Sequence, residues 1–286
     1  MLQHKAAALL ALAVLCTPAM NAHADTLGQI RKSGEIRLGY RTDAPPMSFT
    51  DANGQAAGYS VELCRRIATA VKDELKLANL KVTTVPLGNE DRIEAVVNNK
   101  ADIECGSTTI TLSRQKLVDF TNMTFVTGGS VLSLADSGID AVAKLAGKSV
   151  AVIAGTTSES ALKAYLSKNL IDARVVVVAN RDEAMKQLEA KQVDAFAGDQ
   201  VVQIGFLMKA SDPAAYKLSK DLFSYEPYAF VVRRNDADFR LVANRALAQI
   251  FRGGQIEQIY GQSFGRAGIR PTPMLTALYT FGALPE

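Results

Sequence analysis

The sequence predicts an α/β fold made of two lobes, and three observations lead to this prediction. Short apolar, β-branched runs alternate with helical patterns, which is typical of βαβ units around a mostly parallel sheet. The alternation occurs twice, once before about residue 127 and again from about residue 145. Two short segments, 127–130 and 224–227, carry Gly, Ser or Pro and separate the two series. We therefore expect two lobes joined by two crossings of the chain, and two crossings make a hinge.

The expected strands are short, and helical patterns lie between them. Val61, Ile67 and Val71 mark one face of a helix, and Leu162 and Leu166 mark one face of a later helix. The strands are expected at Glu35–Gly39, Lys81–Pro86, Asp102–Gly106, Lys148–Ala154, Arg174–Ala179 and Asp194–Gly198.

The second crossing is followed by a strand-like run, Tyr228–Arg233, and by a helical pattern from Asp238 to Phe251. This order predicts a discontinuous first lobe to which the C-terminal segment returns. We expect residues 25–127 and 228–286 in the first lobe and residues 128–227 in the second.

The N-terminus has the pattern of a secretory signal peptide over residues 1–24. Lys5 precedes an apolar run, and the A-x-A site Ala22-His23-Ala24 predicts cleavage after Ala24. A lipoprotein anchor at Cys16 is disfavoured, because the bulky Leu15 precedes it. The apolar run is too short to span a bilayer comfortably, and no other stretch is long and apolar enough.

The composition excludes several classes of enzyme. His4 and His23 are the two histidines, and both would leave with the signal peptide. The mature chain then has no His ligand for zinc, no His general base and no Ser-His-Asp triad. We expect no catalytic residue, no metal and no cofactor, although enzymes that use carboxylates alone remain possible. Lys and Arg number 32 against 29 Asp and Glu and are scattered, so no nucleic-acid partner is expected.

Two cysteines remain in the mature chain. Cys105 ends an apolar run and Cys64 lies early in a helix, so both are expected near the carboxyl ends of strands. In an exported protein they are able to form a disulfide. Two buried free thiols are the alternative, and the residues leave both open.

The segment 104–114 is the most informative for function. An apolar strand ends at Gly106, hydroxyl side chains follow, and Arg114 enters the start of the next predicted helix, where backbone N–H groups favour an anion. A guanidinium with hydroxyl donors suits an α-carboxylate. The alternative is a Ser/Thr-rich turn with a surface arginine.

The second half of the chain repeats this arrangement. Gly155-Thr156-Thr157-Ser158-Glu159 follows a strand, and Thr156 with Glu159 fits a capping box whose free N–H groups still suit an anion. Asp199 follows the strand Asp194–Gly198 and is placed to accept hydrogen bonds from an ammonium group, although aspartate is also a common helix N-cap.

These motifs carry a resemblance to a known family. The segments 58–60, 107–109, 155–157 and 198–199, together with Arg114, resemble the polar amino acid-binding proteins of bacterial ABC importers. The segments 39–41, 91–93, 104–109 and 114–116 are similar to their glutamate/aspartate-binding branch, and the resemblance covers essentially the whole mature chain. It implies the two-lobed periplasmic binding protein fold of the clamp-like type II, with a two-strand hinge and no catalysis. It also implies a periplasmic location, the membrane permease of an ABC importer as partner and, as we expect, a monomer.

The resemblance also implies roles for individual residues. Arg114 would hold the α-carboxylate with Thr109 and Thr157, and Ser107 and Asp199 would receive the α-ammonium group. At the other end of the ligand, Arg41 and Arg92 match arginines that this branch directs at the side-chain carboxylate.

Two departures from the branch are visible. Arg181 stands where the branch often has a histidine near the side-chain carboxylate, which keeps a donor for an anion but changes its reach. The run Tyr228-Ala229-Phe230 lacks the cysteine that the family pairs with Cys105, so any disulfide here must use Cys64.

Three alternatives remain at this point. A periplasmic cyclohexadienyl dehydratase resembles these binding proteins and uses a pocket carboxylate as general acid, a role for which Glu62, Glu90 or Glu104 would be candidates. A sensory domain is a second alternative, and a binding protein for another polar amino acid is a third. The sequence does not separate glutamate from aspartate, because one methylene group changes the fit only slightly.

Overall fold

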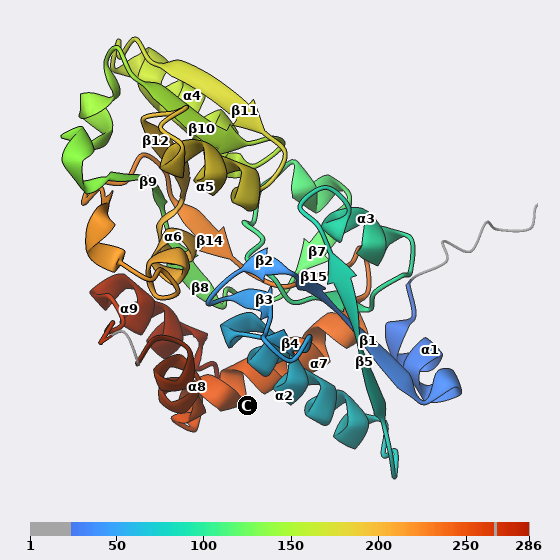
Figure 1. Cartoon of the computed structure of the whole chain (residues 1–286). Helices are drawn as coiled ribbons and strands as arrows, with labels where there is room; N and C mark the ends of the chain where they lie inside the picture. The colour runs from blue at the N-terminus through green and yellow to red at the C-terminus, as the bar shows by residue number, and fades with distance from the viewer. Residues whose placement is uncertain (1–23, 266–267, 286) are drawn as a thin grey trace, which may run out of the picture.

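The structure, a computed structural model, describes residues 24–265 and 268–285. Except for Ala24, the predicted signal peptide lies outside the described residues. The chain forms two lobes, each built around a five-stranded sheet, and both sheets have helices packed on them (Figure 1). The α/β class and the two lobes agree with the sequence prediction.

The sheet of the first lobe has the order β5-β1-β6-β15-β7. β1 is parallel to β5 and β6, whereas β15 runs antiparallel to β6 and β7. Its strands are β1 (Glu35–Arg41), β5 (Lys81–Leu87), β6 (Ile103–Glu104), β7 (Val118–Phe120) and β15 (Val231–Arg233).

Helices cover this sheet, and a small sheet stands beside it. Leu63, Ile67 and Val71 are spaced by four residues on α2, so they share one face, and this face is fully buried. α2 packs against α7 and α8. The small sheet consists of β2 (Asp43–Ala44), β3 (Ser48–Thr50) and β4 (Ala56–Ala57). The helices are α1 (Thr26–Ser33), α2 (Tyr59–Glu74), α3 (Arg92–Val97), the 3₁₀ helix η1 (Arg114–Lys116), α7 (Ala237–Arg252), α8 (Gln255–Phe264) and α9 (Pro273–Gly282).

The sheet of the second lobe has the order β11-β10-β12-β9-β13. β10 is parallel to both neighbours and entirely buried, which explains its continuous apolar sequence. The strands are β9 (Gly129–Leu134), β10 (Ser149–Ile153), β11 (Arg174–Val178), β12 (Ala195–Asp199) and β13 (Tyr216–Leu218), and the helices are α4 (Thr157–Lys168), α5 (Arg181–Glu189), α6 (Gln200–Leu207) and the 3₁₀ helices η2 (Ala135–Ser137), η3 (Val142–Leu145) and η4 (Pro213–Ala215).

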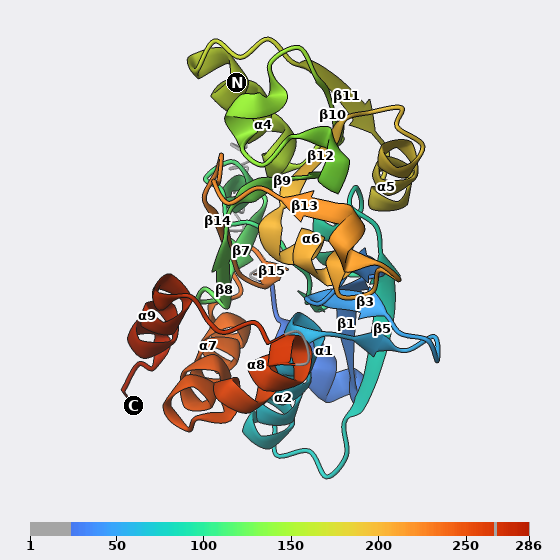
Figure 2. The same ribbon diagram turned by 60° about the vertical axis from the view of Figure 1, so that its left-hand side comes forward.

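Two short antiparallel strands, β8 (Phe125–Thr127) and β14 (Glu226–Tyr228), lie between the lobes (Figure 2). The single strand expected at 228–233 is divided, because the chain stops pairing with β8 after Tyr228 and pairs with β6 and β7 from Val231. We propose lobe boundaries at these crossings, with residues 25–127 and 228–286 in the first lobe and 128–227 in the second.

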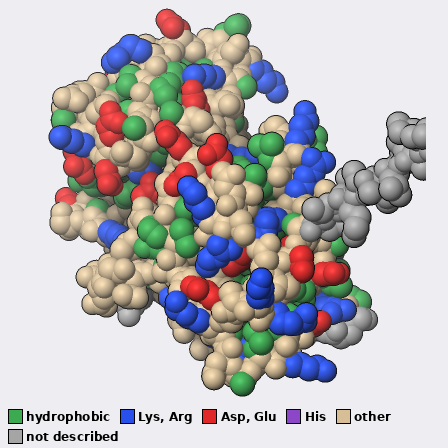
Figure 3. Space-filling view, turned by 90° about the vertical axis from the view of Figure 1, so that its right-hand side faces the viewer, with side chains coloured by type: hydrophobic (Ala, Val, Ile, Leu, Met, Phe, Trp, Pro, Cys, Tyr) green, Lys and Arg blue, Asp and Glu red, His purple; other side chains and the backbone are tan. Residues whose placement is uncertain are grey.

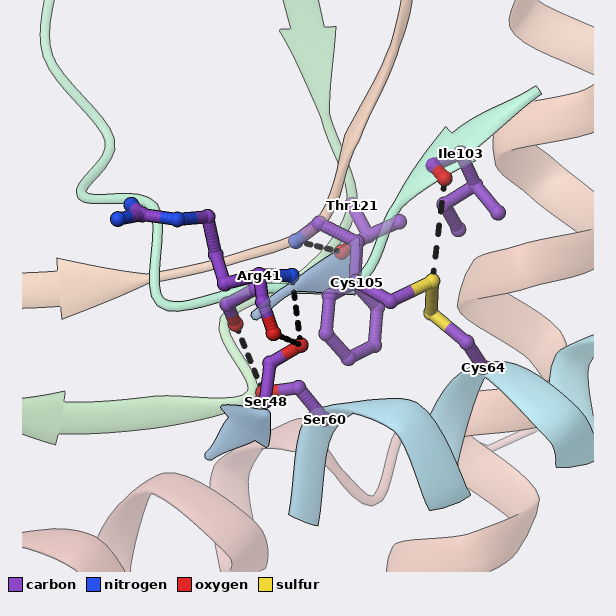
Figure 4. Close-up of a disulfide and its surroundings, with 9 residues drawn as sticks. Arg41, Ser48, Ser60, Cys64, Ile103, Cys105 and Thr121 are labelled. Carbon is purple, nitrogen blue, oxygen red and sulfur yellow. Dashed lines mark hydrogen bonds between the residues drawn. A yellow bond between two sulfur atoms is a disulfide. The ribbon is translucent and has the colours of Figure 1, made fainter. Parts of the chain in front are cut away.

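Cys64 and Cys105 form a disulfide, with their Cα atoms 6.1 Å apart. Figure 4 shows that this bond joins α2 to the chain that leaves β6. The structure thus resolves the alternative that the residues left open. The bond fastens the segment leading to Ser107 and Thr109 to the helical layer of the first lobe.

The lobes also touch away from the crossings. Gly205 on α6 lies against the backbone of Pro45, and a Cβ atom at this glycine would stand 2.1 Å from the Pro45 carbonyl oxygen. Nearby, the ammonium group of Lys209 lies 4.1 Å from the centre of the Phe49 ring. Only a residue without a side chain fits at position 205 in this arrangement.

The surface carries charges of both signs. On the face in Figure 3, Lys and Arg side chains lie among Asp and Glu side chains. Within residues 24–265 and 268–285, none of the helices has the length and hydropathy needed to cross a membrane.

The disulfide generates a stability prediction. It closes a loop with a sequence separation of 41 residues, and restricting the unfolded chain over such a loop stabilises a protein by about 4 kcal/mol. We expect the Cys64→Ser/Cys105→Ser double variant to lose about this much free energy of unfolding, measured by urea denaturation of the oxidised proteins. Reductant should lower the stability of the wild type to that of the double variant and leave the variant unchanged. A reductant-insensitive wild type would contradict the prediction.

Candidate ligand-binding site

A cavity between the lobes brings together seven of the predicted binding residues. They come from the ends of strands or the starts of helices in both lobes, where side chains of an α/β protein converge. The cavity is lined by Arg41, Arg92, Ser107, Thr109, Thr157, Arg181 and Asp199, together with nine further residues that include Asn89 and Ser158.

Arg114 is placed differently from the other seven. It lines a neighbouring opening of the cleft, which it shares with Thr109, Thr157 and Glu226. Its Nη1 donates a hydrogen bond to the Thr109 carbonyl oxygen at 2.7 Å. The sequence predicts a helix that begins at Arg114 and offers its N-terminus to an anion. The structure has only the three-residue η1 here, so this prediction is wrong. Burial lowers the pKa of Arg114, and the charges of Glu104, Glu226 and Asp199 oppose this shift.

Local sequence explains how the second lobe presents its groups. One half of the capping box at the start of α4 is present, because Thr156 Oγ1 accepts a bond from the Glu159 N–H at 3.1 Å. Glu159 in turn accepts a bond at 2.8 Å from the N–H of Gly155, one residue before the N-cap. Thr157 is the first residue of α4, Arg181 is the first residue of α5, and Asp199 is the last residue of β12.

Glu226 joins the two threonines at one end of the cleft. Its Oε2 accepts hydrogen bonds from the hydroxyl of Thr109 at 2.6 Å and from that of Thr157 at 2.7 Å, and its Oε1 accepts one from Ser224 at 2.6 Å. Burial raises the pKa of Glu226, and the charge of Asp199 adds to the shift. Sequence reasoning missed Glu226, since a carboxylate on a short crossing strand gives no local signal of its partners.

Asp199 accepts hydrogen bonds from the second lobe and from a crossing strand. Its Oδ1 accepts a hydrogen bond from the Ser158 hydroxyl at 2.6 Å, and its Oδ2 accepts one from the Tyr228 hydroxyl. Ser158 lies in the motif that the sequence analysis singled out, whereas Tyr228 was read only as part of a strand. Because Tyr228 is on β14, this bond joins a crossing strand to the second lobe.

The opposite end of the cavity is rich in buried arginine. Arg41 Nη2 pairs with Asp43 Oδ1 at 2.8 Å, and Arg181 Nη1 pairs with Asp43 Oδ2 at 2.9 Å. Arg92 donates from Nη1 to the carbonyl and side-chain oxygens of Asn89, and the former contact is 2.7 Å long. Asn89 in turn donates to the Ala154 carbonyl oxygen across the cleft at 3.1 Å.

Burial and mutual repulsion act on these guanidinium groups. Burial, with the nearby charges of Arg41 and Arg114, lowers the pKa of Arg92 to about 9, which still leaves it protonated at neutral pH. Burial and the charge of Arg181 also lower the pKa of Arg41. The Nε atoms of Arg41 and Arg92 are buried without a hydrogen-bond partner among the described residues. Donors of this kind favour an anion.

Glu104 lies behind the arginines, fully buried. Its carboxylate oxygens have no hydrogen-bond partner among the described residues. Burial raises its pKa, and the positive charges of Arg92, Arg41 and Arg114 oppose this. A Cβ atom at Gly106 would lie 2.0 Å from Glu104 Oε1 and 3.0 Å from Arg41 Cγ, so a larger residue here would displace the Glu104 carboxylate.

Comparisons with known proteins agree on one family. Residues 36–266 match the bacterial extracellular solute-binding proteins, family 3. A Pseudomonas aeruginosa protein named L-glutamate/L-aspartate-binding protein is 35% identical over 240 residues, which are 84% of this chain and 80% of that protein. The glutamate/aspartate import solute-binding protein of Escherichia coli is 31% identical over 268 residues, 92% of this chain and 89% of its own.

A solved structure supports the same conclusion. The ancestral amino acid-binding protein AncCDT-1, described as a precursor of cyclohexadienyl dehydratase, superposes with a TM-score of 0.72 at 30% identity, covering 84% of this chain and all of its own. The family match, the sequence relatives and the solved structure agree over most of the chain. The chain therefore belongs to the bacterial extracellular solute-binding proteins of family 3.

Proposed function

We propose that this chain is a periplasmic binding protein that captures an acidic amino acid, glutamate or aspartate, between its lobes. It would deliver the amino acid to the membrane permease of an ABC importer, as a monomer without catalytic activity. The names of its relatives in Pseudomonas aeruginosa and Escherichia coli support the ligand class. The observation that carries the proposal is the cluster Arg41, Arg92 and Arg181 at one end of a cavity whose other end holds Asp199 and threonine hydroxyls.

The chemistry of the two ends matches an acidic amino acid. A side-chain carboxylate would accept hydrogen bonds from buried guanidinium groups, whereas an amide would place an NH₂ donor against donors. At the other end, Asp199 with Ser107 would hold the α-ammonium group. Thr109, Thr157 and Arg114 would hold the α-carboxylate, which would share or displace the two threonine bonds to Glu226.

An enzyme on the same scaffold is the second candidate, because AncCDT-1 is described as a precursor of a dehydratase. A general acid must reach the substrate, yet Asp199 is the one carboxylate among the described residues lining the cavity. Glu62, Glu90 and Glu104 do not line it. This arrangement favours binding over catalysis.

A ligand panel tests the proposed function. The protein is first unfolded, dialysed and refolded to remove bound ligand. In calorimetric titration we then expect it to bind glutamate or aspartate with release of heat. Glutamine and asparagine should bind about 100-fold more weakly, because buried donors would be left without acceptors. Tight binding of glutamine would contradict the acidic assignment. Conversion of prephenate or arogenate to product, measured by absorbance, would favour the enzyme.

Arg92→Met tests the end of the cavity proposed to bind the side-chain carboxylate. We expect affinity for glutamate or aspartate to fall by about 100-fold or more, and affinity for glutamine to change much less, since the lost guanidinium makes a charge-assisted bond to a carboxylate but only an ordinary one to an amide oxygen. Arg66→Met is the matched control, because Arg66 is an exposed arginine of the same lobe that pairs with Glu62. Equal losses for acid and amide would assign Arg92 a purely structural role.

Arg114→Ala tests the end of the cleft proposed to bind the α-carboxylate, a group that all amino acids share. Removing the partner of a buried α-carboxylate is expected to cost about 3 kcal/mol or more for every ligand, acid or amide. Calorimetry with a protein shown to be folded by circular dichroism measures this loss. Near-native affinity would remove Arg114 from the ligand contacts, in line with its position outside the main cavity.

A further inference from the structure

Asp43 lies between two arginines that belong to opposite lobes. It is on β2, two residues after Arg41, and each of its carboxylate oxygens pairs with one arginine, Oδ1 with Arg41 and Oδ2 with Arg181. The two arginine side chains are only 3% and 8% exposed, and Asp43 is 23% exposed. The protein thus supplies a carboxylate of its own to the arginine-rich end of the cleft.

The remaining arginine has no such partner. Arg92 is bonded to the uncharged oxygens of Asn89, and no carboxylate forms an ion pair with it among the described residues. Its Nε and the Nε of Arg41 are buried without a partner there. This end of the cleft therefore offers free donors for one further anionic group, centred on Arg92.

Asp43 remains ionised in this environment. Burial opposes its ionisation, but the charges and hydrogen bonds of Arg181 and Arg41 outweigh burial, so the pKa of Asp43 lies below its ordinary value. A fixed negative charge consequently stands beside Arg41 and Arg181, which line the same cavity as Arg92. A ligand group with a second negative charge would be repelled by this charge, and Arg41 and Arg181 would attract it less.

We propose that Asp43 is a specificity-determining residue, which neutralises Arg41 and Arg181 so that the cleft accepts a side chain with one negative charge and rejects a dianionic one. The inference rests on the proposed function. The rejected class includes phosphate monoesters of amino acids, such as O-phospho-L-serine, whose phosphate carries close to two negative charges at neutral pH. Repulsion of the wrong ligand by a fixed like charge is a general way to obtain specificity.

The test compares L-glutamate with O-phospho-L-serine by calorimetric titration near neutral pH. The wild type should bind glutamate at least about tenfold more tightly than O-phospho-L-serine. Asp43→Asn keeps the shape of the side chain but removes its charge and leaves two arginines to attract the dianion. We expect this variant to reduce the preference for glutamate by about tenfold or more, or to reverse it.

Asp119→Asn is the matched control. Asp119 is also an ion-paired aspartate of the first lobe, 21% exposed, but its partner Arg240 does not line the cavity, whereas both arginine partners of Asp43 do. Its substitution should leave the glutamate preference unchanged. If Asp43→Asn does not fold, Asp43→Ser removes the same charge with a smaller side chain and should shift the preference in the same direction.

The outcomes separate this inference from the proposed function. A wild type that binds glutamate, with the same preference in folded Asp43→Asn or Asp43→Ser, would overturn the role of Asp43 alone. A wild type that binds O-phospho-L-serine as tightly as glutamate would also overturn it. A wild type that binds neither glutamate nor aspartate would overturn the proposed function and this inference with it.

Discussion

Three guanidinium groups share one buried end of the cleft, and much of the site is arranged to balance their charge. Buried like charges are costly unless anions or hydrogen-bond acceptors compensate them. Arg41 and Arg181 are compensated by Asp43, whereas Arg92 receives only the dipoles of Asn89. Glu104 lies behind them without a direct hydrogen bond and lowers the local potential from a distance. Burial, together with the charges of Arg41 and Arg114, lowers the pKa of Arg92, and the nearby carboxylates do not offset this shift.

The residues at the proposed binding site also connect the lobes. Asp43 reaches Arg181, Asn89 reaches the Ala154 carbonyl, and Glu226 holds Thr109. Each of these contacts crosses between segments far apart in the sequence. If the proposed site is right, a ligand entering the cleft would exchange contacts with these bonds, and ligand binding would be coupled to the arrangement of the lobes.

Periodicity predicted the fold well because the strands that build the sheets carry local signals. After Ser149 and Arg174 at their first positions, β10 and β11 are runs of valine, alanine and isoleucine, a β-branched pattern typical of strands. Because strand ends meet at one edge of a sheet, the positions of Arg41 and Asp199 also followed from the chain order. The roles of these residues in ligand binding stay a proposal, as do the lobe boundaries.

The missed residues lack any local signal. Asp43 is separated from Arg181 by 138 positions, and Glu226 is separated from Thr109 by 117. No periodicity connects such pairs, because three-dimensional folding alone brings them together. Arg114 illustrates the opposite error, since its hydroxyl-rich neighbourhood resembled a helix start but forms only one short 3₁₀ turn.

Gly205 and Pro45 meet through backbone atoms, without a side chain between them. Side chains change rotamer to relieve a clash, but a carbonyl oxygen held in a folded segment does not. This contact therefore acts as a rigid stop for the approach of the two lobes. Any molecule held between the lobes would have to fit within the spacing that this contact sets.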